Sequence, residues 1–175
     1  MSQCEETTTP RIYIACLASY NRSILHGRWI DAIDADDIRA EIAAMLAESP
    51  VPGAEEWAIH DYEGFGSLQV SEFEDLEQVA EIGRLIDEYG QAFAAYAAHV
   101  GIDFATEVGF QEAYRGEWGS EEEYGEEIFD EWYANQIPEN IRCYIDYEAY
   151  AHDLFMNDCY SIENPDGGVY VFMNQ

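Results

Sequence analysis

Residues 11–18 have the sequence Arg-Ile-Tyr-Ile-Ala-Cys-Leu-Ala, and this stretch decides the fold of the N-terminal part of the chain. Its β-branched, aromatic and apolar residues predict a buried strand. Two further short strands are predicted downstream, at Arg28–Asp31 and at Glu56–Asp61. Between them, Asp34 can cap a helix, because its side chain can accept hydrogen bonds from the free N–H groups of the first turn. We therefore predict a small α+β unit over residues 10–60.

Beyond this unit the spacing of apolar residues becomes helical. Ser71 and Glu74 fit a capping box, and apolar residues then follow at three- and four-residue intervals. Gly90 predicts the end of this helix, since glycine readily adopts the left-handed conformation of a helix C-terminus. A second helix is predicted over Gln91–Val100. Together the two helices predict a helical middle domain over residues 61–103.

The C-terminal part is predicted to combine helices with a terminal β-hairpin. Its turn, residues 164–168, is Asn-Pro-Asp-Gly-Gly, a composition typical of hairpin turns. The predicted elements are helices over Phe104–Tyr114, from Ser120 to about Asn135 and from Asp146 to about Phe155, then strands at Cys159–Glu163 and Val169–Phe172. Ser120 and Glu123 form another capping box at the start of the second of these helices. Residues 1–9 are predicted to be a disordered leader. The whole chain is thus predicted to be an elongated α+β protein, folded as one domain or as two or three small ones.

The charge balance excludes several classes of function. The chain has 37 Asp and Glu against 7 Arg, contains no Lys and carries a formal net charge of −30. Without Lys it can contain neither a Walker A loop nor a Schiff-base lysine. Such a surface repels phosphate, so we expect no direct nucleic-acid partner and no contact with an anionic membrane surface. Aromatic residues make up 14% of the chain, which argues for a folded protein.

The negative charge increases toward the C-terminus. The net charge is −6 over residues 1–58, −9 over residues 59–103 and −15 over residues 104–175. The densest stretch, Glu112–Glu131, holds nine acids and a single base, Arg115. On the helix predicted there, acids recur every four residues, and each such pair of like charges destabilises a helix by roughly 0.2–0.5 kcal/mol. A surface that costs stability and lacks compensating cations points to a function for the charge itself.

The amount of charge matches that of duplex DNA. B-form DNA carries one charge per about 1.7 Å, so a net charge of −30 corresponds to about 15 base pairs, or about 50 Å of duplex. We therefore predict DNA mimicry, in which carboxylates stand where phosphates would stand. The candidate phosphate-like carboxylates are Asp75, Glu77, Glu81, Asp87, Glu88, Asp103, Glu107, Glu112, Glu117, Glu121, Glu122, Glu123, Glu126, Glu127, Asp130 and Glu131.

No motif predicts an active site. The four histidines are isolated in sequence, and neither an H-E-x-x-H motif nor a Cys/His cluster indicates a metal site. Carboxylates are so abundant that no single pair stands out as a glycosidase dyad. We therefore expect a protein that is not an enzyme and that binds no metal or cofactor. The polar N-terminus and the absence of an 18-residue apolar stretch favour a cytoplasmic location.

Aromatic residues are interleaved with the acidic stretch. Most of them are expected to pack in the core, but an acidic helix with excess aromatics can also form half of a dimer interface, where Tyr, Trp and Phe are enriched. Our candidates for a dimer contact are Phe129, Trp132 and Tyr133.

Several strings resemble the ArdA-type antirestriction proteins, in the order in which that family has them. They are Pro10–Asn21 (PRIYIACLASYN), Leu25–Asp31 (LHGRWID), Glu55–Phe65 (EEWAIHDYEGF), Tyr114–Trp118 (YRGEW), Tyr144–Ala151 (YIDYEAYA) and Val171–Asn174 (VFMN). The resemblance covers about residues 10–174. Residues 1–9 and the absence of lysine are departures from the family pattern.

The resemblance implies a fold, a function and partners. Proteins of this family are encoded on mobile genetic elements, resemble bent B-form DNA and occupy the DNA groove of type I restriction-modification enzymes. They are elongated three-domain α+β chains that dimerise through the C-terminal domain. The resemblance implies an N-terminal α+β domain over residues 10–60, a helical middle domain over residues 61–103 and an acidic, dimerising α+β domain over residues 104–175. The resemblance therefore implies a competitive inhibitor of type I enzymes, acting as a homodimer that protects incoming mobile DNA.

Three other functions remain open from the residues alone. A halophilic protein would use its acids to hold hydration and would unfold at low salt. An acidic chaperone would bind basic proteins broadly. A hydrolase with a carboxylate pair would need a concave pocket and raised carboxyl pKa values.

Overall fold

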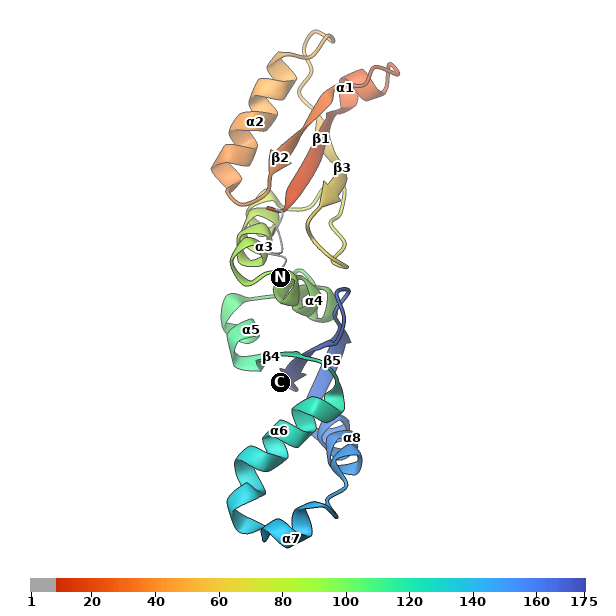
Figure 1. Cartoon of the computed structure of the whole chain (residues 1–175). Coiled ribbons are helices and arrows are strands. Elements are labelled where there is room, and N and C mark those ends of the chain that lie inside the picture. Colours follow the sequence, from red (N-terminus) through yellow and green to blue (C-terminus); the bar gives the residue numbers. More distant parts are fainter. Residues whose placement is uncertain (1–8) are drawn as a thin grey trace, which may run out of the picture. The chain divides into compact units, whose positions relative to one another are not determined.

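The computed structural model describes residues 9–175 and divides the chain into two compact units, residues 1–106 and 107–175 (Figure 1). Each unit has its own three-stranded antiparallel sheet and its own helices, so the predicted α+β class is confirmed. The first unit includes both the range predicted as the N-terminal domain and the range predicted as the middle domain. The three-domain division therefore stays a prediction. The predicted leader lies outside the described residues except for Thr9.

The sheet of the first unit has the stretch that opens the sequence as its central strand. Strand β1 (Arg11–Cys16) pairs with β2 (Gly27–Asp31) on one side and β3 (Trp57–Glu63) on the other. A short helix, α1 (Leu17–Tyr20), follows β1 directly. The central position explains the apolar composition of β1, because a strand with neighbours on both edges is covered most completely.

Helix α2 (Ala35–Ala47) begins at the predicted cap. The Asp34 side chain accepts hydrogen bonds from the N–H groups of Asp36 at 2.9 Å and Asp37 at 3.0 Å. The helix contacts β1 and β2 and buries Ile38 and Met45 completely. The cap and the apolar face thus place α2 on the sheet, as Figure 1 shows.

Helices α3 (Leu76–Tyr89) and α4 (Gln91–Val100) complete the first unit. The cap of α3 is Asp75, one residue beyond the predicted capping box, and it accepts from the N–H groups of Glu77 and Gln78. Of that box, only the hydrogen bond from the Ser71 N–H to the Glu74 carboxylate is formed. Gly90 ends α3 with φ of 73°, as predicted, and α4 begins at the next residue.

The second unit has a sheet with the strand order β4-β6-β5. Its elements are α5 (Glu107–Ala113), β4 (Tyr114–Trp118), α6 (Glu121–Tyr133), the 3-10 helix η1 (Ala134–Gln136), α7 (Glu139–Arg142), α8 (Tyr147–Asn157), β5 (Cys159–Glu163) and β6 (Val169–Met173). The predicted terminal hairpin is confirmed as β5 and β6. The prediction of a helix from Phe104 to Tyr114 was wrong at both ends, because α5 is shorter and Tyr114 begins a strand.

Strand β4 was not predicted, because its sequence lacks the usual pattern of a strand. It is only five residues long, and two of the five are charged. It also contains Gly116 at φ of 102°, where the register with β6 shifts. Glycine within a strand often marks such an irregularity. The carbonyl oxygen of Arg115 accepts a hydrogen bond from the Trp118 indole N–H at 3.0 Å, which turns the indole back over the irregular strand.

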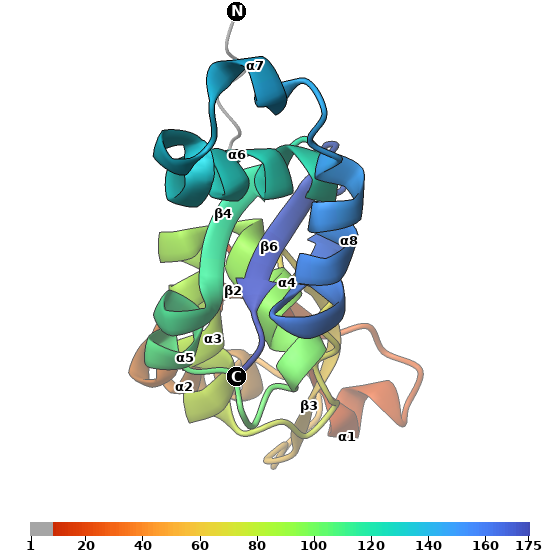
Figure 2. The same ribbon diagram turned by 90° about the horizontal axis from the view of Figure 1, so that it is seen from below.

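Helices α6 and α8 pack against each other beside the second sheet (Figure 2). Gly125 permits the contact, since a Cβ at that position would lie 2.6 Å from the Cβ of Ala151. The core beneath them consists of Tyr124, Leu154, Cys159 and Val171. In the described part of the chain, no helix has the length and apolarity needed to cross a bilayer.

The buried phenol of Tyr124 makes the second unit sensitive to alkaline pH. Burial raises the pKa of Tyr124 to about 12, because the apolar core disfavours tyrosinate. The folded-state pKa is above the unfolded value of about 10, so this stabilisation is complete below pH 10 and lost as pH rises toward 12. We expect Tyr124→Phe to make the free energy of unfolding fall less steeply above pH 10, as measured by denaturant unfolding at several pH values. Tyr144→Phe is the control, since Tyr144 is 82% exposed, and equal slopes for wild type and Tyr124→Phe would contradict the prediction.

Candidate functional site

Several arginines of the first unit form ion pairs with its carboxylates. Arg28 bonds Glu41 and Glu48, each at 2.7 Å, and Arg84 bonds Glu81 and Glu88, each at 3.0 Å. Arg11 pairs with Glu63, the residue opposite it on β3. Two of the predicted phosphate-like carboxylates, Glu81 and Glu88, are therefore partly compensated by a cation on their own helix.

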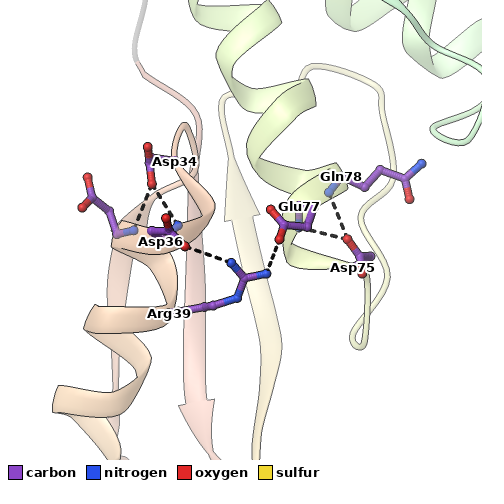
Figure 3. Close-up of polar contacts among 7 residues, drawn as sticks. Asp34, Asp36, Arg39, Asp75, Glu77 and Gln78 are labelled. Carbon is purple, nitrogen blue, oxygen red and sulfur yellow. Dashed lines mark hydrogen bonds and ion pairs between the residues drawn. The ribbon is translucent and has the colours of Figure 1, made fainter.

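A further arginine connects helices α2 and α3. Arg39 donates to Asp36 on its own helix at 3.2 Å and to Glu77 on α3 at 2.5 Å (Figure 3). The hydrogen bond to Glu77 is the main cause of the raised pKa of Arg39. Beside it, Asp75 caps α3, so both of these candidate carboxylates also have a structural partner.

Several other candidate phosphate-like carboxylates also accept hydrogen bonds within their own unit. Gln78 donates to Asp103 at 3.1 Å, and Gln111 donates to Glu107 at 3.4 Å. In the second unit, Asn164 donates to Glu117 and the Ser161 hydroxyl donates to Glu121, both at 2.6 Å. These side chains contribute negative charge, but they also have a structural partner.

The start of α6 is capped as predicted. The Ser120 hydroxyl accepts from the N–H of Glu123 at 3.1 Å, and the Glu123 carboxylate accepts in turn from the N–H of Gly119 at 2.8 Å. Three glutamates, residues 121–123, occupy the first turn, where the positive end of the helix dipole stabilises negative charge.

Asp130, near the end of α6, is the most structurally engaged acid of this helix. It lies 3.4 Å from the Arg142 guanidinium and accepts from the Tyr147 hydroxyl at 3.1 Å. Burial and then this hydrogen bond raise the pKa of Tyr147. Asp130 is also only half-exposed, so it connects α6 to α7 and α8.

Six candidate carboxylates have neither a hydrogen bond nor an ion pair with any described residue, and all six are exposed. They are Asp87, Glu112, Glu122, Glu126, Glu127 and Glu131. Four of the six are exposed positions of α6, whereas Tyr124 and Ile128 of the same helix face the core. We call these four, Glu122, Glu126, Glu127 and Glu131, the α6 acidic face. This face concentrates unpaired negative charge on a helix whose other side is anchored to α8 and the sheet.

The arrangement suits electrostatic binding to a basic surface. The two units each carry a net charge of −15, but the second reaches it with 69 residues (17 acids, 2 Arg) and the first with 106 (20 acids, 5 Arg). Within residues 9–175, no group of three or more His, Cys, Asp or Glu side chains is arranged to hold a metal ion. Exposed carboxylates fixed on a helix can attract a basic surface without any chemical step.

A family model described as Antirestriction protein (ArdA) matches residues 12–166, which span most of both units. The chain belongs to this family. No curated protein matched the chain in the sequence comparison. Membership in the ArdA family gives the chain an antirestriction function directed at restriction-modification enzymes, and makes it an inhibitor protein rather than an enzyme.

The three aromatic residues proposed for an ArdA dimer contact have different environments. Phe129 is half-buried, and its ring centroid lies 5.1 Å from that of Tyr150 and 5.5 Å from that of Tyr147. Trp132 is 58% exposed and Tyr133 is 38% exposed, at the C-terminal end of α6. Phe129 therefore packs within its own unit, whereas Trp132 and Tyr133 are available at the surface.

The candidate list omitted acids of the first unit that also share a surface. A hollow of about 500 Å³ beside β2 and α2 is lined by Trp29, Ile30, Asp31, Ile33, Asp34, Asp37, Ala40 and Glu41. Of these acids, Asp34 was predicted to cap a helix, and it does so; Asp37 lies in the first turn of that helix. The spacing of Asp34, Asp37 and Glu41 at three and four residues is the sequence signal that they share one side of α2.

Proposed function

We propose that this ArdA-family protein mimics bent B-form DNA and competitively blocks the DNA-binding groove of type I restriction-modification enzymes. The observation that supports the proposal is the α6 acidic face, whose carboxylates have no cation or donor of their own among the described residues. A Lys/Arg-lined groove would supply those cations. The chain would thereby protect incoming mobile DNA in the cytoplasm of the recipient cell.

The binding energy in this proposal comes from counterion release. A groove that binds DNA has condensed anions around its basic side chains, and carboxylates entering it release those anions as phosphates would. Because the field is distributed over many carboxylates, each one contributes little alone. The structurally engaged acids still add to the field, since a hydrogen bond does not remove their charge.

The proposed active species is a homodimer joined through the second unit. Exposed aromatic residues near charged helices are typical of interface centres, and Trp132 and Tyr133 have this character. Phe129 would support the contact from beneath, since it packs against Tyr133 with ring centroids 5.2 Å apart. Pairing two copies would double the net charge presented to the enzyme.

Displacement of duplex DNA from a purified type I methyltransferase core tests the proposal. We expect the protein to compete with DNA, and the logarithm of its affinity to fall linearly with the logarithm of salt concentration. Failure to displace DNA at low salt, or an affinity that salt does not change, would contradict it. Unfolding at low salt, seen by circular dichroism, would favour a halophilic protein, and equal binding to any basic protein would favour an acidic chaperone.

A further inference from the structure

One stretch of this acidic chain contains no acid at all. Residues 7–30 have no Asp or Glu, although the chain has 37, and they include three of its seven arginines. Within this stretch, Tyr20 ends α1 and residues 21–26 lead from it to β2, and we call residues 20–25 the α1–β2 loop. Figure 1 shows this loop beyond the end of the first sheet. Its composition is opposite to that of the surface proposed to mimic DNA.

The α1–β2 loop exposes apolar side chains. Leu25 is 91% exposed, Tyr20 is 57% exposed and Ile24 is 39% exposed. Arg22 is also exposed, and no hydrogen bond or ion pair joins its guanidinium to another described residue. In a protein with so many carboxylates, an arginine that pairs with none of the described ones is available to a partner.

Backbone hydrogen bonds to the buried Ser19 order the α1–β2 loop. The N–H groups of Arg22 and Ile24 both donate to the carbonyl oxygen of Ser19, at 2.9 and 3.0 Å. Ser19 is fully buried, and its hydroxyl is 3.0 Å from that of Ser49 at the end of α2. Ser23 has φ of 60°, a conformation that is uncommon outside glycine and that these bonds maintain.

A neighbouring strand supports the loop from the side. The Tyr20 ring packs edge-on against His60 of β3, with ring centroids 4.8 Å apart. The two residues also line a hollow of about 440 Å³, together with Ile59, Tyr62, Val70 and Glu72. A loop that is already ordered loses little conformational entropy on binding, so its apolar contacts convert efficiently into affinity.

We propose that the α1–β2 loop is a second contact with the restriction-modification enzyme, docking on an apolar protein surface that carries a carboxylate. This inference rests on the proposed function. The basic DNA groove is excluded as the docking surface, because it would repel Arg22. An anionic membrane is disfavoured as well, since the first unit carries a net charge of −15. A carboxylate complements Arg22, and apolar side chains around it would cover Tyr20, Ile24 and Leu25.

Charge reversal at Arg22 tests this contact, because the contact and a purely electrostatic groove binder predict opposite changes in affinity. Arg22→Glu makes the protein more acidic, so a purely electrostatic groove binder would bind the methyltransferase core equally well or more tightly. We expect it instead to bind about tenfold more weakly, because a close opposite charge pair becomes a like pair. Arg115→Glu is the matched control, an exposed arginine within the acidic stretch of the second unit, and we expect it to bind equally well or more tightly.

Leu25→Ser tests the apolar part of the contact. We expect the affinity for the core to fall about tenfold at both low and high salt with an unchanged salt slope, since burial of a leucine is insensitive to ionic screening. Circular dichroism checks that each variant is folded. Unchanged binding by both Arg22→Glu and Leu25→Ser, with wild type still displacing DNA, would overturn the loop contact and leave the proposed function standing.

Two further measurements distinguish docking on the enzyme from a contact between copies of the chain and from membrane binding. Loss of dimers in Leu25→Ser, seen by sedimentation, would assign the loop to a contact between copies. Binding of the wild type to vesicles of anionic lipid that Leu25→Ser abolishes would assign it to a membrane. Either result would overturn the docking on an enzyme. Failure of the wild type to displace DNA at all would contradict the proposed function and, with it, this second contact.

Discussion

Reversal of Glu122, Glu126 and Glu127 to Lys is expected to weaken displacement of duplex DNA from a type I methyltransferase core by roughly 10- to 100-fold at low salt, equivalent to about 1.4–2.8 kcal/mol. The three residues belong to the α6 acidic face and have no hydrogen bond or ion pair with a described residue. Each substitution replaces an attraction to the basic groove with a repulsion. The salt dependence should also become shallower, because fewer counterions are released.

The choice of these three residues separates function from folding. Neighbouring Glu121 and Glu123 are unsuitable, since one accepts from Ser161 and the other from the N–H of Gly119. The control is the triple variant Glu148→Lys, Asp153→Lys and Asp166→Lys, which changes the same total charge at exposed positions of the same unit. An equal loss of inhibition in both triple variants would show that net charge matters and that its place on α6 does not.

The second large effect concerns the stability of the first unit. Gly83 lies in the middle of α3, and a Cβ there would collide with the carbonyl oxygen of Ala32, between β2 and α2. Backbone cannot rotate away as a side chain can, so α3 must move away from the connection between β2 and α2. We expect Gly83→Ala to lower the free energy of unfolding by about 3 kcal/mol, although alanine favours helix formation.

Denaturant unfolding measures this loss, and a second glycine provides the comparison. Gly53 has φ of 73° with no atom near its prospective Cβ, so Gly53→Ala introduces backbone strain of only about 1–2 kcal/mol without a collision. If Gly83→Ala is no less stable than Gly53→Ala, α3 does not approach the strand connection as closely as the structure indicates.

Local signals in the sequence were sufficient for much of the fold. Asp34 and Ser120 were predicted to cap a helix, and each does so through its own side chain. A helix was predicted to begin at Asp146, and this residue caps α8. Gly90 was predicted to end a helix and does. These features depend on neighbours within four residues, which is why the sequence reveals them. Strand β4 depends instead on pairing with β6, more than 50 residues away, so its own sequence could not reveal it.

Which carboxylates have a structural partner and which have none could not be predicted, for the same reason. The sequence showed where the carboxylates are dense but not which ones have partners. Glu77 is paired with Arg39 across 38 residues, and Glu117 is bonded to Asn164 across 47. Only tertiary structure brings such pairs together. The aromatic residue Phe129 is a similar case, because its neighbours Tyr147 and Tyr150 come from α8.

The α6 acidic face also links folding to binding. Its like charges repel one another in the free protein, and no described cation relieves them. A partner that supplies positive charge removes that repulsion at the same time as it binds. By thermodynamic reciprocity, whatever binds the folded helix more tightly than the unfolded chain must also stabilise the fold. A basic partner that binds this face would therefore be expected to raise the free energy of unfolding of the second unit.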